Sequence, residues 1–285
     1  MRESHISRFR QRPLTGYLLT LLFAGSVAVA NGQELKEFDR RYLQSPPHGP
    51  SLPRAADEIA RRTNEFRSRH SLGNLRPNPY LQHSAEYFAA YLARTDQFGH
   101  EADGNTPEQR ANLYKYEDCI VAENIAYQMR ASGFATSELA QNFTVGWENS
   151  PHHRENMLDP DITETGVAIG YSPGMRRYFA VQEFGLPKAS MILFEVANRT
   201  PDTLHYIINQ PPRDTSPPQS FELPPRGTMS HSLCRPATID WGWTKENDAV
   251  RTKSGILYVI TKSDAHYDVA ETPLPQPNEP PPAKQ

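Results

Sequence analysis

The sequence predicts an α+β fold in which helices come first along the chain and an antiparallel sheet follows. Apolar residues recur at helical spacing in three stretches between residues 55 and 148, whereas alternating runs joined by a turn begin at Thr165. After Pro187 the helical spacing disappears and short strand-like runs take over. We therefore expect one mixed domain followed by a smaller all-β module.

Three amphipathic helices are predicted before the sheet. The first begins at Ala55 and ends before Gly73, and the third covers residues 137–148. The second has the clearest start, because Asn78 can cap it and Pro79 occupies the first helical position, where no backbone N–H is needed. The apolar stripes of the second and third helices are Leu81, Ala85, Phe88 and Leu92, and Leu139, Phe143 and Trp147.

The strands are predicted from alternation and from turn residues. Runs 165–171 and 176–185 flank the turn 172–174 and predict an antiparallel hairpin. Short runs separated by Pro and Gly then predict a β-sandwich-like module over 188–270, at 191–198, 204–209, 220–224, 238–241 and 255–261. Residues 271–285 contain six prolines among fifteen residues, which favours a disordered tail.

The first thirty residues have the pattern of a signal peptide. Arginines precede an apolar run at 17–30, and the run ends in the small-x-small sequence Ala28-Val29-Ala30. The run is shorter than the roughly 20 residues that a membrane span requires. We expect export with cleavage near Asn31, no membrane span afterwards, and a flexible lead-in at 31–54. The protein is then secreted, periplasmic or held in the cell envelope.

Composition narrows the function classes. The net charge of -3 is not that of a nucleic-acid-binding protein, which normally carries a basic stripe. The chain has two cysteines, Cys119 and Cys234. In an exported protein they could form a disulfide, or they could remain two buried thiols, which behave as small apolar groups. The sequence leaves both readings open.

Two histidines and a glutamate mark the candidate site. His100 follows the second predicted helix, Glu123 follows a β-like run, and His153 follows the helix that contains Trp147. Imidazole nitrogens and a carboxylate could bind a divalent ion such as zinc. They could equally form a hydrogen-bonded network in which Glu123 fixes the orientation of a histidine. No cofactor is required by the second reading.

Three stretches around these residues, FGHEADGNTPEQR at 98–110, AENIAY at 122–127 and GWENSPHHRENMLDP at 146–160, resemble the signature of the CAP superfamily, in its bacterial SCP-domain form. The resemblance covers residues 55–187 and implies an α-β-α sandwich. It also implies a central cleft with two histidines and two acidic residues, in which His100, Glu123 and His153 take three of the four positions. Ala122 and His152 stand where the family pattern has glycine.

The fourth position of the family's cleft is not matched by an acidic residue. Ser150 stands at that distance from Trp147, as it does in the bacterial pattern. Glu148 is acidic but lies two residues earlier, which turns a helical side chain by about 200°. We expect Glu148 to point away and Ser150 to lie nearest the fourth position.

Three functional hypotheses follow, the third being a structural envelope protein with a vestigial cleft. In the first, the chain is a binding protein whose cleft takes a small ligand, lipid, glycan, metal ion or envelope protein rather than catalysing a reaction. In the second, it is an extracellular hydrolase. Either a zinc ion on His100, Glu123 and His153 would activate water, or Ser150 would act as nucleophile with His153 as base and Glu123 as its orienting carboxylate.

Overall fold

The computed structural model of this chain describes residues 38–212, 216–243, 249–264 and 266–274. The expected signal peptide and residues 275–285 of the expected proline-rich tail lie outside these ranges. None of the helices in the described part of the chain is long and apolar enough to cross a membrane.

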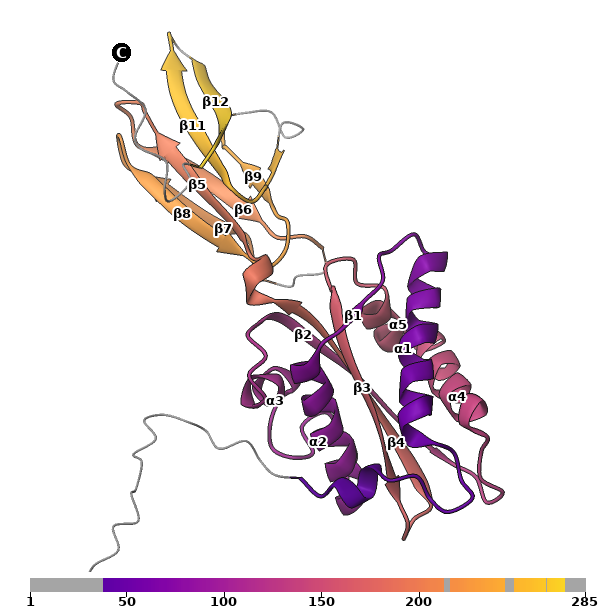
Figure 1. Cartoon of the computed structure of the whole chain (residues 1–285). Helices are drawn as coiled ribbons and strands as arrows, with labels where there is room; N and C mark the ends of the chain where they lie inside the picture. The colour runs from indigo at the N-terminus through magenta and orange to yellow at the C-terminus, as the bar shows by residue number, and fades with distance from the viewer. Residues whose placement is uncertain (1–37, 213–215, 244–248, 265, 275–285) are drawn as a thin grey trace, which may run out of the picture. The chain divides into compact units, whose positions relative to one another are not determined.

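The first part of the chain is a mixed domain with helices on both faces of one sheet (Figure 1), as the sequence predicts. The sheet has four strands in the order β1-β3-β4-β2. β3 and β4 form the predicted antiparallel hairpin, and β4 also pairs antiparallel with β2. The elements are η1 (Arg40–Leu43), α1 (Leu52–Arg69), β1 (Arg76–Pro77), α2 (Pro79–Thr95), α3 (Pro107–Leu113), β2 (Asp118–Met129), α4 (Thr136–Glu148), α5 (Pro151–Met157), β3 (Glu164–Ser172), β4 (Arg177–Pro187) and η2 (Lys188–Ser190).

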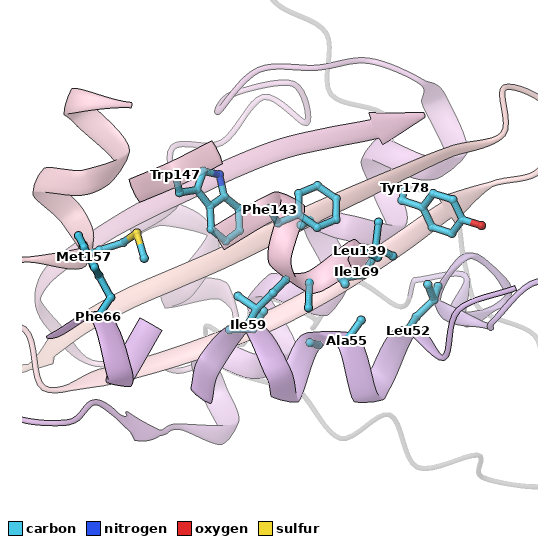
Figure 2. Close-up of a cluster of buried hydrophobic side chains, with 14 of the residues drawn as sticks. Leu52, Ala55, Ile59, Phe66, Leu139, Phe143, Trp147, Met157, Ile169 and Tyr178 are labelled. Atoms are coloured by element: carbon cyan, nitrogen blue, oxygen red, sulfur yellow. The ribbon is translucent and has the colours of Figure 1, made fainter. Parts of the chain in front are cut away.

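Helices α1, α4 and α5 cover one face of the sheet and form the larger core. Figure 2 shows the side chains of α1, such as Ile59 and Phe66, meeting Phe143 and Trp147 of α4 above the strands. These residues are almost fully buried, and each aromatic ring contributes a large apolar area. The stripe predicted at Leu139, Phe143 and Trp147 is therefore the face that α4 presents to the sheet.

Helix α2 covers the other face and packs directly on the backbone of β3. Its predicted start is confirmed, because the Asn78 side chain accepts hydrogen bonds from the first helical N–H groups. Two glycines of β3 make the close approach possible. A Cβ on Gly166 would lie 2.3 Å from the backbone nitrogen of Gln82, and one on Gly170 would lie 2.2 Å from the carbonyl oxygen of Ala89.

The segment before α1 differs from the expectation of a flexible lead-in. From Phe38 onward it packs against α2, where the Phe38 ring lies 6.2 Å from that of Tyr87 and Arg40 lies 3.5 Å from Glu86. Helix α1 also begins at Leu52 rather than at Ala55. The sequence pattern misses this packing because the segment is rich in proline and has no repeating period.

The second part of the chain is a β-sandwich. One sheet has the order β10-β9-β6-β7 and the other β12-β11-β5-β8, and aromatic and aliphatic residues of both sheets share one buried cluster. β8, β10 and β12 were not predicted, and β12 ends at Pro273, inside the expected tail. The strands are β5 (Ile192–Asn198), β6 (Leu204–Asn209), β7 (Gln219–Leu223), β8 (Thr228–Leu233), β9 (Thr238–Asp240), β10 (Val250–Arg251), β11 (Ile256–Ser263) and β12 (His266–Pro273).

The two cysteines form a disulfide, which resolves the alternatives that the sequence leaves open. Cys119 lies near the start of β2 and Cys234 directly follows β8. Their Cα atoms are 5.4 Å apart, within the range that a disulfide requires. The bridge joins positions separated by 115 residues and links the two parts of the chain covalently.

Candidate functional site

The candidate site is built around a hydrogen bond between His100 and Glu123. His100 lies in the turn region after α2, and its Nδ1 lies 2.7 Å from Oε1 of Glu123. The Glu123 side chain is fully buried, whereas 49% of the His100 side chain remains exposed. Glu123 sits in the middle of β2 rather than at a strand end, which corrects the expectation from the sequence. A rigid strand thus holds the carboxylate that orients a solvent-facing imidazole.

Arg110 ties this pair to the surrounding loop. Its guanidinium is fully buried, lies 3.4 Å from Oε2 of Glu123, and donates to Asp103 and to the backbone carbonyl of His100. The guanidinium also lies over the ring of Phe88, 3.4 Å from the ring centroid. Arg110 comes from α3, which begins with a capping box at Thr106. Arg110 therefore fixes the loop that carries His100 and neutralises the carboxylates beneath it.

The surroundings of the two histidines shift their pKa values in opposite directions. The hydrogen bond to Glu123 raises the pKa of His100, although burial opposes this effect. Because Glu123 accepts from Nδ1, the proton of the neutral ring stays on Nδ1. Burial lowers the pKa of His153, and the nearby His100 and His152 lower it further. A positive charge on His100 thus disfavours protonation of His153.

Helix α5 is fastened to β2 by asparagine side chains. Asn124 donates to the backbone carbonyl of His153 at 3.1 Å. Asn156 donates to the side-chain oxygen of Asn124 and to the backbone carbonyl of Glu123. These bonds hold the helix that carries His153 against the strand that carries Glu123.

Three other predicted residues lie apart from this pair. Glu148 points to Arg69, 3.5 Å away, and makes no bond to either histidine in the described structure. Ser150 occupies the N-cap position of α5, yet its side chain forms no capping hydrogen bond. Gln182, in the predicted strand 176–185, is fully buried and bonds to Thr63 and Thr165.

The donor set does not form a metal site in this structure. Within the described ranges, no group of three or more His, Cys, Asp or Glu side chains is arranged to hold an ion. Both oxygens of Glu123 already have partners, in His100 and Arg110. A metal bound by Glu123 would have to displace one of them, so the residues present fit a hydrogen-bonded network rather than a resident metal.

Sequence reasoning missed a second buried carboxyl group, that of Glu183. Glu183 lies directly opposite Glu123 in the pairing of β4 with β2. Ser84 donates to its Oε1 at 3.1 Å, while its Oε2 is buried without a hydrogen-bond partner in the described structure. Burial, and then the charge of Glu123, raise the pKa of Glu183 well above its usual value. The one available signal was a glutamate beside Gln182 in the predicted strand 176–185.

The comparisons with known proteins agree with this fold. Residues 60–184 match the model of the Cysteine-rich secretory protein family, CAP. An uncharacterised protein of Borreliella burgdorferi is 28% identical over 102 residues, which are 36% of this chain and 60% of that protein's length. This chain therefore spans about 60% of the curated relative that it matches.

Solved structures of CAP-type proteins are also similar. An outer surface protein from Borrelia burgdorferi has 22% identity and a TM-score of 0.42, covering 47% of this chain and 93% of that chain. An extracellular protein containing a SCP domain from Bacillus anthracis has 26% identity and a TM-score of 0.40, covering 50% of this chain and 45% of that chain. With the family match, the sandwich of helices and sheet and the motif residues in place, residues 60–184 form a CAP domain.

Proposed function

We propose that this chain is an extracellular binding protein in which the surface around His100, Glu123 and His153 receives a ligand. One observation carries the proposal: a half-exposed imidazole is held at 2.7 Å by a fully buried carboxylate. Burying Glu123 and Arg110 is costly unless they are paired, as they are here. Buried, paired charges that fix the orientation of one exposed ring are typical of a recognition site on a rigid scaffold.

Two features support a location outside the cytoplasm. The sequence of residues 1–30 has the pattern of an export signal. The disulfide between Cys119 and Cys234 suits an oxidising compartment, since cytosolic thiols are normally kept reduced. Secretion, a periplasmic location and attachment to the cell envelope are all compatible with these features.

The two histidines give the site complementary chemistry. The raised pKa of His100 makes protonation of its ring easier than in a free imidazole, and the protonated ring donates from both nitrogens, whereas the lowered pKa of His153 makes protonation of that ring harder. A ligand that accepts a hydrogen bond at one ring and donates at the other fits this pair. Carboxylate, phosphate and sugar hydroxyl groups all supply acceptors of this kind.

The test follows the two rings by NMR. We expect one class among acetate, inorganic phosphate, N-acetylglucosamine, phosphocholine micelles and Zn²⁺ to shift the His100 and His153 ring signals saturably. The double change His100→Gln and His153→Gln should abolish saturable binding, followed in every variant by the backbone amide signals of Glu123 and Asn124, and leave the fold intact, with His48→Gln as the matched exposed control. If no class moves both rings, or the double variant binds equally well, the proposal fails. Hydrolysis of peptide or ester substrates that disappears with His153→Gln would replace it with the hydrolase reading.

A further inference from the structure

Strand β2 forms one outer edge of the four-stranded sheet. The N–H of Thr163 donates to the carbonyl of Gly185, so the backbone groups of Gly185 face away from β2. Since backbone direction alternates along a strand, every second residue of β2 pairs with β4 and the others face outward. From the register, the outward residues of β2 are Val121, Glu123, Ile125, Tyr127 and Met129.

The outward backbone groups have partners at one end of β2 and lack them at the other. At Glu123 the carbonyl accepts from Asn156. At Tyr127 and Met129 no hydrogen bond to the outer side is present within the described residues. These two residues are 46% and 59% exposed, whereas Ile125 is buried. The open part of the edge therefore runs from Ala126 to Met129.

An aromatic surface adjoins this open edge. The ring of Phe98 lies 5.2 Å from that of Tyr127 in an edge-to-face arrangement, and both rings contact the buried ring of Phe179. Phe98 is itself 48% exposed. Exposed apolar side chains that cluster in this way mark interaction sites more often than isolated ones do. Phe98 and Tyr127 are two residues and four residues from His100 and Glu123 respectively, so this surface lies beside the candidate site.

The far end of the edge carries excess positive charge. Arg130 follows Met129 in sequence, and Arg177 is the register partner of Met129 in β4. Each of these two arginines pairs with one carboxylate. Arg176 is exposed, and its hydrogen bond in the described structure goes to a backbone carbonyl rather than to an acid. One positive charge is therefore left uncompensated beside Met129.

We propose that the outer edge of β2 at Tyr127 and Met129 binds an extended acidic peptide segment of a partner protein by strand addition. The peptide backbone pairs with the unpartnered N–H and C=O groups. An apolar side chain of the peptide lies on Phe98 and Tyr127, and an acidic side chain two positions away meets Arg176. Alternate residues of a strand lie on the same face, and the face that carries Tyr127 also carries Arg177, whose guanidinium lies 4.8 Å from the Tyr127 ring centroid.

The observations favour a peptide over other occupants. A lipid surface could meet the aromatic rings and the arginines, but it has no backbone to pair with Tyr127 and Met129. A second copy of this chain could pair its β2 edge with this one. The β2 strand of that copy would then bring Arg130 to the basic end, where an acid is needed, or would leave the basic end unpaired. Charge complementarity therefore selects an acidic segment.

The experiment uses the full exported chain and a panel of synthetic extended heptapeptides. Each carries Phe, Leu or Tyr two positions from Asp or Glu, in both orders, with Thr and Val elsewhere. Backbone amide signals of Tyr127 and Met129 are followed by NMR. We expect saturable shifts at both amides, and binding about tenfold weaker when the acid becomes Lys or when alternate peptide amides are N-methylated. A tenfold change corresponds to about 1.4 kcal/mol, close to the net worth of one hydrogen bond.

A matched pair of variants separates backbone from side chain. Met129→Pro removes the outward N–H, and proline is tolerated where that group faces solvent at a sheet edge. We expect Met129→Pro to weaken peptide binding about tenfold and Met129→Ala to change it by less than about twofold, because only the first removes a hydrogen bond. Should Met129→Pro fail to fold, the N-methylated peptides make the same distinction on the unmodified protein.

Several outcomes would overturn the inference. One is that no peptide of the panel shifts the Tyr127 and Met129 amides at millimolar concentration. Others are indifference to N-methylation, a dimer in solution whose β2 amides are protected, or binding to anionic phosphatidylglycerol vesicles in the absence of peptide binding. The proposed ligand site is judged separately by the ring signals of His100 and His153, so either proposal can fail while the other stands.

Discussion

Replacing Arg110 by Met should be the most damaging single change at the candidate site. The Arg110 side chain is fully buried, as are the carboxylates of Asp103 and Glu123 that it contacts at 3.3 and 3.4 Å. Methionine fills similar space but leaves the buried carboxylate of Asp103 without its guanidinium, and leaves Glu123 with the His100 imidazole as its one remaining partner of positive charge among those described here. Removing one partner of a buried ion pair costs about 3–5 kcal/mol, because the remaining charge stays desolvated. We expect a loss of about 4 kcal/mol of the free energy of unfolding.

The assay is native-state hydrogen exchange at the amide of Val181, which lies in the buried centre of β4 and reports opening of this domain alone. The control is Arg61→Met, because Arg61 pairs with exposed acids and such pairs contribute roughly 0.2–1 kcal/mol. In the double variant Arg110→Met with Glu123→Gln, one stranded charge is gone. Its loss should therefore be smaller than the sum of the two single losses by about 1–3 kcal/mol.

A cost below about 1 kcal/mol for Arg110→Met, the range of the exposed control, would refute this expectation. A double variant that loses the full sum would refute it as well. Either result would mean that the Arg110 guanidinium does not stabilise the buried carboxylates, and that the loop with His100 is held by other contacts.

Three further changes test the fold and its titration. Changing both Cys119 and Cys234 to Ser removes the bridge that closes a 115-residue loop. The lost restriction of the unfolded chain corresponds to about 5 kcal/mol, so the melting temperature should fall sharply. An unchanged melting temperature would contradict the bridge. Gly170→Ala places a Cβ 2.2 Å from a carbonyl oxygen of α2 and should lower the free energy of unfolding by at least about 1–3 kcal/mol. Gly146 is an exposed residue of α4 whose added Cβ would meet nothing, so Gly146→Ala should raise that free energy by up to about 1 kcal/mol. Effects of the same sign would contradict the packing. The folded state raises the pKa of Glu183, so above pH 4.5 this residue ionises in the unfolded chain first and lowers the stability of the unchanged protein. Glu183→Gln removes this loss and should therefore stabilise the protein increasingly as the pH rises above 4.5. A difference between variant and unchanged protein in urea unfolding that does not depend on pH would contradict this.

Local chemistry explains why parts of the fold were predictable. Asn78 and Pro79 specify a helix start through their own side chain and ring, and both act there in the structure. The hairpin of β3 and β4 follows from alternation around a turn. Features without a period were missed. The end of β12 was assigned to the tail, and the segment around Phe38 was expected to be flexible, because both depend on packing against residues distant in sequence.

Motif spacing along the chain predicts His100, Glu123 and His153 as site residues, and the structure joins the first two by a hydrogen bond. Their hydrogen bonds depend on the tertiary fold. Strand pairing places Glu183 opposite Glu123, and the fold brings the guanidinium of Arg110 next to the carboxylate of Glu123. The disulfide was left open for the same reason, because the distance between Cys119 and Cys234 depends on 115 residues of intervening chain. Burial, charge compensation and edge exposure are properties of contacts between distant segments, and a linear pattern does not contain them.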